Sequence, residues 1–267
     1  MNVLRFELRA ARTTTALWIV AILALTSMYL SIYPAFSSDA DQLIKTLQHI
    51  PAAMNHILGM GGDLRLFSFF GFFGNVFPFV TLIGAIQATV VGLGILSKEP
   101  ATNTTDFLLS KPKTRTAVYG EKVAASLGLL IVTEIVVTVS AYILAKAFGS
   151  GDIDGTQYLL FWGAFALIQW WFFGLGLLLS QLVRKLKSVT PLAIGVSFGF
   201  FLLAIFGMIV GDDAVRWMTP FRFIDYKKIV TDSAYDPAHI VYGITLTIIF
   251  VGISYIIYTR KDIPAAI

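Results

Sequence analysis

The chain has 267 residues, of which 57% are hydrophobic and 13% charged, with a formal net charge of +4 and a mean hydropathy of +0.77. Ordinary soluble domains are about 45–50% apolar and about 25% charged, so this composition excludes a water-soluble globular protein. Because the chain has no cysteine, a disulfide framework and a thiolate metal site are excluded as well. Its basic residues are scattered between apolar stretches, which argues against nucleic-acid binding.

The first 15 residues combine Arg5, Arg9 and Arg12 with apolar neighbours. This pattern predicts a short helix at the membrane interface, with its arginines among anionic headgroups. A basic flank that only fixes the topology of the first span explains the same residues, and the two interpretations are compatible. The apolar run that follows lacks a small-residue cleavage site, so we expect a retained first helix.

Six apolar stretches are long enough to cross a hydrocarbon core of about 30 Å, which needs roughly 20 residues of helix. The second contains Gly71, Gly74 and Pro78 and exceeds a perpendicular span, so we expect a kink or an extension beyond the bilayer. The sequence therefore predicts one all-α membrane domain over the whole chain. Its expected spans are residues 16–33, 67–96, 123–148, 157–181, 189–211 and 239–258.

The distribution of lysine and arginine predicts the orientation, because these residues accumulate on the cytoplasmic side. Thirteen of the 20 basic residues fall in the N-terminal segment, in loops 97–122 and 182–188 and in the C-terminal tail. Six fall in residues 37–65 and 212–237, the segments on the opposite side of the membrane, and loop 149–155 on that side has none. Both termini are therefore predicted to be cytoplasmic.

Two longer segments are predicted to lie outside. Residues 37–65 repeat apolar side chains at helical spacing broken by Pro51, which predicts two short amphipathic helices. Residues 212–237 mix Trp217 and Phe221 with charged residues, a composition typical of interfacial or partly re-entrant structure.

The cytoplasmic loop between the second and third spans is the most informative segment. Pro100 suits the first turn of a helix and Pro112 ends it, so a short helix is predicted between them. Its apolar edge, Phe107 and Leu108, is flanked by basic residues on a loop too short to be a domain, which favours a docking surface for a partner. A turn that packs on its own bundle is the alternative. Thr114 is placed to cap the third membrane helix.

The loop also carries an ordered motif: an acidic residue, a threonine-containing short helix, Leu-Leu-Ser-x-Pro-x-Thr-Arg-Thr, and Gly-x-Lys. Its positions are Glu99, Thr105, Leu108, Leu109, Ser110, Pro112, Thr114, Arg115, Thr116, Gly120 and Lys122. This motif resembles the corresponding loop of ABC-2-type permeases, the membrane-spanning subunits of ATP-driven exporters. Three other stretches resemble the same family, namely Ile57-Leu-Gly before Asp63, Thr219 to Asp225, and the tail from Tyr258 to Ile263.

The resemblance implies that the loop helix is a coupling helix seated in a cleft of a separate ATPase subunit. The residues expected to dock there are Glu99, Thr105, Phe107, Leu108, Leu109, Pro112 and Arg115, assisted by the N-terminal helix and by Arg184 and Lys185. Permeases of this family work in pairs, with an identical or related copy, among the lipids of the bacterial plasma membrane. The resemblance also implies that the transported substrate is an amphipathic or apolar compound, such as a peptide antibiotic or a lipid.

The chain contains no G-x-x-x-x-G-K-[ST] motif, so it lacks a phosphate-binding loop of its own. ATP and Mg²⁺ would bind the partner, and we expect no enzymatic activity, cofactor or metal site in this chain. Two other functions stay open. One is a membrane immunity or signalling protein that binds a ligand without transport. The other is a membrane-embedded enzyme, although the spans offer little polar chemistry beyond Glu134.

Glu134 falls within the third span, where a carboxylate costs at least about 3 kcal/mol unless it is protonated, paired or in contact with water. It is a candidate for the substrate path or for proton or cation handling. The alternative is a hydrogen bond to a neighbouring helix, for which Asn75, Gln87 or Gln169 are possible partners.

Small and aromatic residues suggest packing sites in the later spans. Gly195 and Gly199 form a G-x-x-x-G pair in the fifth span, which permits close helix contact either inside the monomer or in a dimer. The family's dimer seam involves the first and fifth helices. A group of five aromatic residues in the fourth span favours lipid contact or core packing, with substrate contact as the alternative. They are Trp162, Trp170, Trp171, Phe172 and Phe173.

Overall fold

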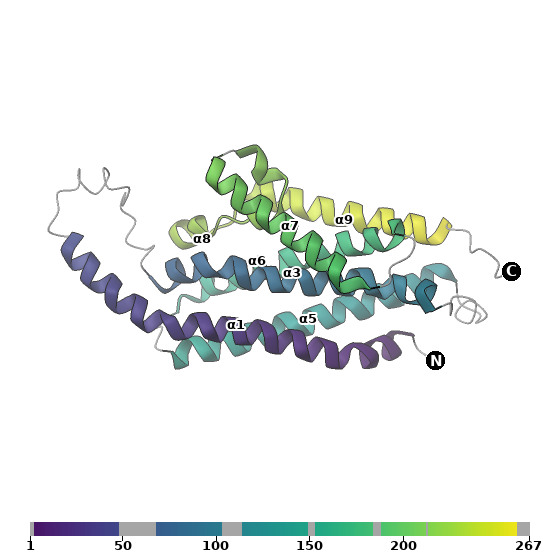
Figure 1. The fold of residues 1–267 in the computed structure, drawn as a ribbon, viewed down its shortest axis with the longest axis horizontal. Helices are drawn as coiled ribbons and strands as arrows, with labels where there is room; N and C mark the ends of the chain where they lie inside the picture. Colours follow the sequence, from purple (N-terminus) through teal and green to yellow (C-terminus); the bar gives the residue numbers. More distant parts are fainter. Residues whose placement is uncertain are drawn as a thin grey trace.

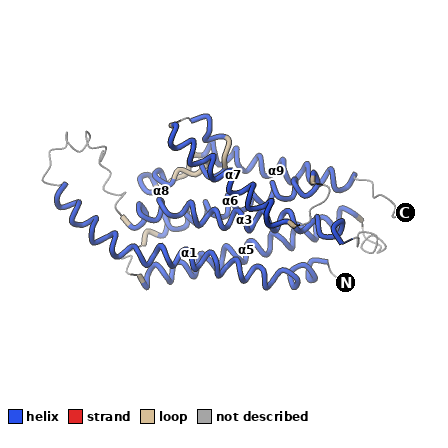
Figure 2. Tube along the Cα trace, in the orientation of Figure 1, coloured by secondary structure: helices blue, strands red, loops and turns tan. Residues whose placement is uncertain are grey.

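The computed structural model describes residues 3–47, 68–102, 114–148, 153–183, 188–211 and 213–260, and this part of the chain contains helices and no strand (Figure 2). Within it, six helices are long and apolar enough to cross a membrane, which confirms the predicted all-α fold with six spans. They are α1 (Val3–Leu47), α3 (Phe69–Thr102), α5 (Arg115–Ala147), α6 (Gly155–Leu182), α7 (Val189–Val210) and α9 (Pro237–Arg260).

The last three spans agree with their predicted limits to within two residues, and local chemistry explains their ends. Asp154 caps α6, because its Oδ1 accepts hydrogen bonds from the backbone N–H groups of Thr156 (2.7 Å) and Gln157 (3.3 Å). Gly211 ends α7 with a φ of 70°, a left-handed conformation that glycine adopts without steric cost.

The first helix differs from the prediction, because α1 runs without a break through 45 residues. The interfacial helix expected over residues 1–15 is thus the beginning of the same helix that forms the first span. No proline or glycine precedes Pro34 in α1, so nothing interrupts its backbone hydrogen bonds, and Pro34 itself lies inside the helix. At 1.5 Å per residue α1 is about 68 Å long and extends beyond a bilayer core of about 30 Å.

The segment expected to form two outer helices, residues 37–65, is described only in part. Its first residues continue α1 to Leu47, and residues 48–67 lie outside the described part of the chain. The predicted break at Pro51 therefore stays a prediction.

The second and third spans are also longer than predicted. α3 continues through Pro100 to Thr102, where a separate loop helix was expected to begin, and at 34 residues it is about 51 Å long. α5 begins at Arg115, eight residues before the predicted start of the span. The predicted cap is confirmed, because Thr114 Oγ1 accepts a hydrogen bond from the backbone N–H of Ala117 at 3.3 Å. Residues 103–113 lie outside the described part.

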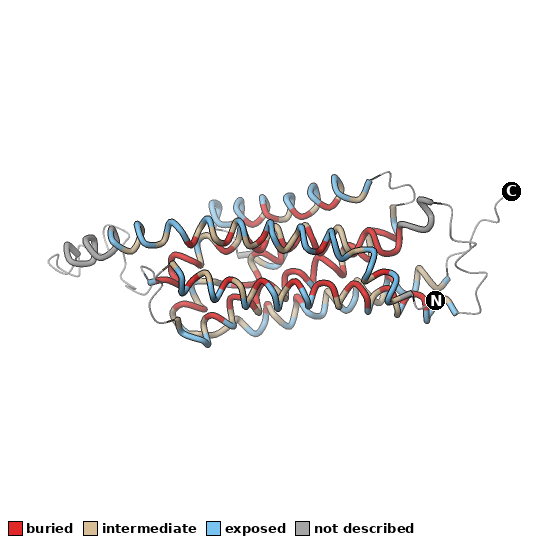
Figure 3. Tube along the Cα trace, turned by 90° about the horizontal axis from the view of Figure 1, so that it is seen from below, coloured by how far each residue is buried: buried red, intermediate tan, exposed pale blue. Residues whose placement is uncertain are grey.

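The two helices at the centre of the bundle are α3 and α6. In the most apolar 18-residue stretch of α3, 67% of the residues are buried, and in that of α6 61% are. In the other four spans the buried share lies between 11% and 28%. Buried residues accordingly concentrate between the helices in the middle of the bundle (Figure 3). A Cβ atom on Gly92 would lie 2.5 Å from the carbonyl oxygen of Phe173, and one on Gly176 would lie 2.9 Å from that of Thr89. The two backbones are therefore in direct contact, which small residues permit.

The segment after α7 folds back onto the bundle. It forms the short helices η2 (Asp213–Trp217), η3 (Pro220–Arg222) and α8 (Tyr226–Asp232), and α8 contacts both α3 and α6. Phe221 and Ile229 are buried, and the ring of Tyr226 stacks on Phe161 with a centroid distance of 5.5 Å. That residues 212–237 are interfacial or partly re-entrant in the membrane stays a prediction.

The first residues of α1 and the last of α9 lie at the same end of the bundle (Figure 1). An even number of crossings requires this arrangement. That this end faces the cytoplasm stays a prediction from the basic residues.

Candidate functional site

A hydrogen-bonded cluster of polar side chains joins α3, α5 and α6 inside the bundle. Gln87 Nε2 donates to Thr133 Oγ1 at 2.9 Å, and Gln169 Nε2 donates to Gln87 Oε1 at 3.1 Å. All three side chains are completely buried. Because lipid offers no substitute partner, such interhelical bonds hold the three helices in register.

Glu134 lies beside this cluster and not in it. Its carboxyl group accepts a hydrogen bond from the indole of Trp170, the residue after Gln169 on α6. Neighbouring residues on a helix point about 100° apart. Because Thr133 points toward Gln87, the next residue, Glu134, points away from Gln87. The predicted partners are thus replaced by Trp170, and Asn75 instead donates to the Gly71 carbonyl of its own helix at 2.9 Å.

One oxygen of this carboxyl group, Glu134 Oε1, is buried and has no hydrogen-bond partner among the described residues. Gln169 Oε1 is likewise buried without a hydrogen-bond partner among the described residues. Trp170, which holds the carboxyl group, is 40% exposed on the surface of the membrane domain. The free oxygen therefore needs a proton, a water molecule or a donor group of a ligand, because a buried acceptor without a partner is costly.

A second set of contacts frames the loop between α3 and α5. Lys122 of α5 is completely buried, and its Nζ donates to the Ile95 carbonyl of α3 at 2.8 Å. A lysine is rarely so buried unless its ammonium group is hydrogen-bonded. This contact ties the end of α3 to the start of α5, the two helices that the loop connects. The sequence placed Lys122 in the loop motif without predicting this role.

The start of α5 is also attached to α9. Tyr119 Oη donates to the Val251 carbonyl at 3.1 Å, and the hydroxyl groups of Thr116 and Tyr255 are 3.2 Å apart. The ring of Tyr119 packs edge-on against that of Tyr255, with centroids 5.4 Å apart. A displacement at the start of α5 would therefore reach α3 and α9 directly.

Most of the predicted docking residues lie outside the described part of the chain. Arg115 is the first residue of α5, and Glu99 belongs to the last turns of α3. The others, which stay predictions, are Thr105, Phe107, Leu108, Leu109, Pro112, Arg184 and Lys185.

The glycine pair of α7 faces open space in the described part of the chain. A Cβ atom on Gly195 or Gly199 would have no neighbouring heavy atom within 4 Å among the described residues, so the space beside both glycines is open. The third glycine of the helix behaves differently, since a Cβ on Gly207 would lie 2.5 Å from Cγ1 of Val215. The face around the pair exposes large apolar side chains, including Phe198 and Leu202.

The predicted aromatic group forms part of the core. Trp162, Trp171, Phe172 and Phe173 are buried, and Trp170 is the exception. This confirms core packing for four of the five residues. No group of three or more histidine, aspartate or glutamate residues in the described ranges is arranged to hold a metal ion.

The sequence as a whole matches a family model described as ABC-2 family transporter protein, over residues 1–263. The matched range includes all six membrane helices and the loop between α3 and α5. No curated protein matches the chain.

Proposed function

Because the chain belongs to the ABC-2 family of transporter proteins, we propose that it is the permease subunit of an exporter of the bacterial plasma membrane, driven by a separate ATPase. It lacks a phosphate-binding loop of its own, so ATP and Mg²⁺ bind the ATPase. The cargo is an amphipathic or apolar compound, such as a peptide antibiotic or a lipid.

The observation that best supports coupling is the contact between Lys122 and the Ile95 carbonyl. The ATPase docks on the loop between α3 and α5, with Phe107 and Leu108 as its apolar contacts. Because the ends of both helices are bonded to each other, a push on the loop moves them together. The bond from Tyr119 to Val251 extends the movement to α9.

Glu134 is our candidate for the substrate path. It lies in the membrane-spanning part of α5, and one of its oxygens is buried without a partner among the described residues. A donor group on the cargo, or a proton, supplies the missing bond. The polar cluster of Gln87, Thr133 and Gln169 next to it keeps α5 and α6 in fixed register.

The permease works as a pair, with a second copy or a related chain on the exposed faces of α7 and α1. The support is the uncovered pair Gly195 and Gly199, which lets a second helix approach closely. On α1 the large apolar side chains Leu17 and Val20 are more than half exposed.

Co-purification tests the docking proposal. The double variant Phe107→Asp, Leu108→Asp places two carboxylates on the contact, and we expect at least a tenfold loss of recovered ATPase. Met218→Asp is the control, because Met218 is 59% exposed in the segment after α7, far along the chain from the loop. Equal recovery of the ATPase with the double variant and with wild type would refute the docking proposal.

A further inference from the structure

Glu134 is isolated from other charged side chains in the middle of the membrane domain. The helices that contact α5 are α1, α3, α6 and α9. No Asp, Glu, Lys, Arg or His occurs in their apolar parts, residues 13–38, 69–97, 155–182 and 240–259, and their tyrosines are neutral at pH 7. On α5 the nearest charged residues toward either end of the span are Lys122 and Lys146, each 12 residues from Glu134, which is about 18 Å of helix. An ionised Glu134 would therefore have no counter-charge among these helices.

The surroundings of the carboxyl group favour its neutral form. The indole of Trp170 donates to this group, and the other oxygen, Glu134 Oε1, is buried without a partner among the described residues. A single donor does not replace the hydration of a carboxylate, and an unpaired charge in the span costs about 3 kcal/mol or more. A carboxylic acid has no charge and still leaves one oxygen to accept from Trp170. Glu134 is therefore protonated in this arrangement of the helices.

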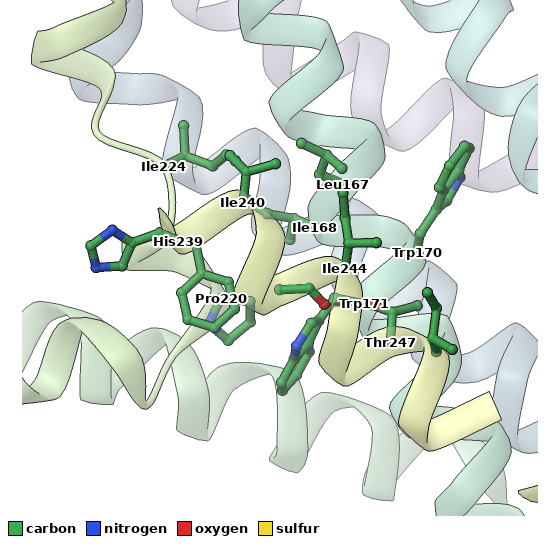
Figure 4. Close-up of a pocket in the computed structure, with 13 residues that line it drawn as sticks. Leu167, Ile168, Trp170, Trp171, Pro220, Ile224, His239, Ile240, Ile244 and Thr247 are labelled. Carbon is green, nitrogen blue, oxygen red and sulfur yellow. Dashed lines mark hydrogen bonds between the residues drawn. The ribbon is translucent and has the colours of Figure 1, made fainter. Parts of the chain in front are cut away.

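The carboxyl group nevertheless lies close to the surface that faces lipid. The side chain of Glu134 is only partly buried, and Ile131 and Ile135 on the same helix are 42% and 58% exposed. Trp170 is 40% exposed at the edge of an apolar groove between α6 and α9, and in Figure 4 its indole points away from His239. Side chains, and not a whole helix, thus separate the carboxyl group from the lipid.

The charge of the site determines which head group replaces the proton. An anion is repelled by the carboxylate, and a neutral head group leaves the carboxylate charge unpaired in the span. A cation with N–H groups supplies the missing donor to Glu134 Oε1, and the nearby indole ring attracts positive charge. The site is electrically neutral in both states, either as the acid or as a carboxylate paired with a cation. Exchange of a proton for a cation therefore avoids an unpaired charge in the membrane.

We propose that Glu134 exchanges its proton for the cationic head group of an amphiphile, so that the cargo of the permease is a cationic amphiphile. The acid releases its proton to the aqueous phase, and the carboxylate pairs with the head group beside Trp170. The apolar chain of the ligand lies against Ile131 and Ile135. This rests on the proposed transport function only in assigning Glu134 to the substrate path.

Infrared spectroscopy of the full chain in lipid nanodiscs tests the first half of the exchange. A protonated carboxyl group has a C=O stretching band that an ionised one lacks. At pH 7 we expect this band in the wild type and its loss in Glu134→Gln. Addition of dodecylguanidinium should also remove the band. A wild-type spectrum without the band, or a band that persists when the ligand has bound, would overturn the proposal.

Calorimetry of the same nanodiscs measures the released proton. The heat of binding is compared in two buffers of different ionisation enthalpy, with empty nanodiscs subtracted. Dodecylguanidinium keeps its own charge at pH 7, so a released proton comes from the protein. We expect release of about one proton per chain on binding to the wild type. Dodecanol, which has the same chain length and no charge, should release none.

Two variants that each lose one carboxylate are matched. Glu134→Gln should release no proton and bind dodecylguanidinium at least about tenfold more weakly. Asp232→Asn, which changes an exposed residue after α7, should behave as the wild type. Binding of dodecylguanidinium without proton release, or equal release by the wild type and Glu134→Gln, would refute the exchange. The comparison of the two amphiphiles on the wild-type chain decides the matter if Glu134→Gln does not fold.

These measurements use the permease without an ATPase, so they are independent of docking. Loss of the exchange with the ATPase still recovered would overturn the role of Glu134 and leave the transport function standing. Failure of the docking experiment with proton release intact would do the reverse.

Discussion

Replacing Lys122 by methionine should loosen the ends of α3 and α5. Methionine keeps the length of the side chain but cannot donate to the Ile95 carbonyl, which Lys122 Nζ contacts at 2.8 Å. A hydrogen bond to a charged group contributes about 1.5–3 kcal/mol. The side chain is completely buried, so solvent does not weaken this bond. The loss corresponds to a population of the opened state that is about 10- to 140-fold higher.

Hydrogen–deuterium exchange measures this opening directly. We expect faster exchange in the last turns of α3 and the first turns of α5, with little change in α7. Lys146→Met is the control, since Lys146 lies at the other end of the same helix and is exposed. Unchanged exchange at the ends of α3 and α5 in Lys122→Met would show that Lys122 does not clamp them, and the coupling route would lose its main support.

Three further predictions concern packing, assembly and pH. Gly92→Ala should lower the thermal midpoint, because the new Cβ would lie 2.5 Å from a backbone oxygen of α6. Gly94→Ala is the control and should leave the midpoint unchanged, because its Cβ would have nothing within 4 Å. Equal midpoints of the two variants would contradict the close contact of α3 with α6. Gly195→Leu with Gly199→Leu should convert dimer to folded monomer in mass photometry, and a persisting dimer would place the seam elsewhere. Burial opposes ionisation of Asp236, but its contacts with His239 and Arg216 hold its pKa below the ordinary 3.8. Its stabilising effect is therefore present above pH 3.8 and lost as the pH falls through the lowered pKa. The thermal midpoint should differ between wild type and Asp236→Asn at pH 5–7 and converge once the pH is below the lowered pKa. A difference that vanishes already at pH 5 would refute this.

The sequence alone predicted what depends on local pattern. The lengths of the apolar stretches predicted the six spans, and the capping hydroxyl of Thr114 predicted where α5 begins. The continuity of α1 was missed because composition near residue 15 changes from basic to apolar while the helical backbone does not. The passage of a helix from the aqueous interface into lipid changes its residue composition, but it does not require a break in its backbone hydrogen bonds.

The features of the site that were missed depend on contacts between distant residues. The G-x-x-x-G spacing drew attention to Gly195 and Gly199, yet the direct contact between the backbones of α3 and α6 uses Gly92 and Gly176, which no short motif connects. Glu134 was recognised as unusual, but its partner follows from how α5 is rotated against α6. Periodicity predicts which face of a helix is apolar, and only packing decides which neighbour each face meets.

Because the chain contains no cysteine, a single introduced thiol is a unique chemical probe of docking. The decisive measurement is disulfide or maleimide cross-linking from Phe107→Cys in membranes that contain the ATPase, with Met218→Cys as the control. We expect a cross-link to the ATPase from position 107, none from position 218, and protection of the cysteine at position 107 from maleimide when the ATPase is bound. Full reactivity at position 107 with the ATPase bound, and no cross-link, would contradict it.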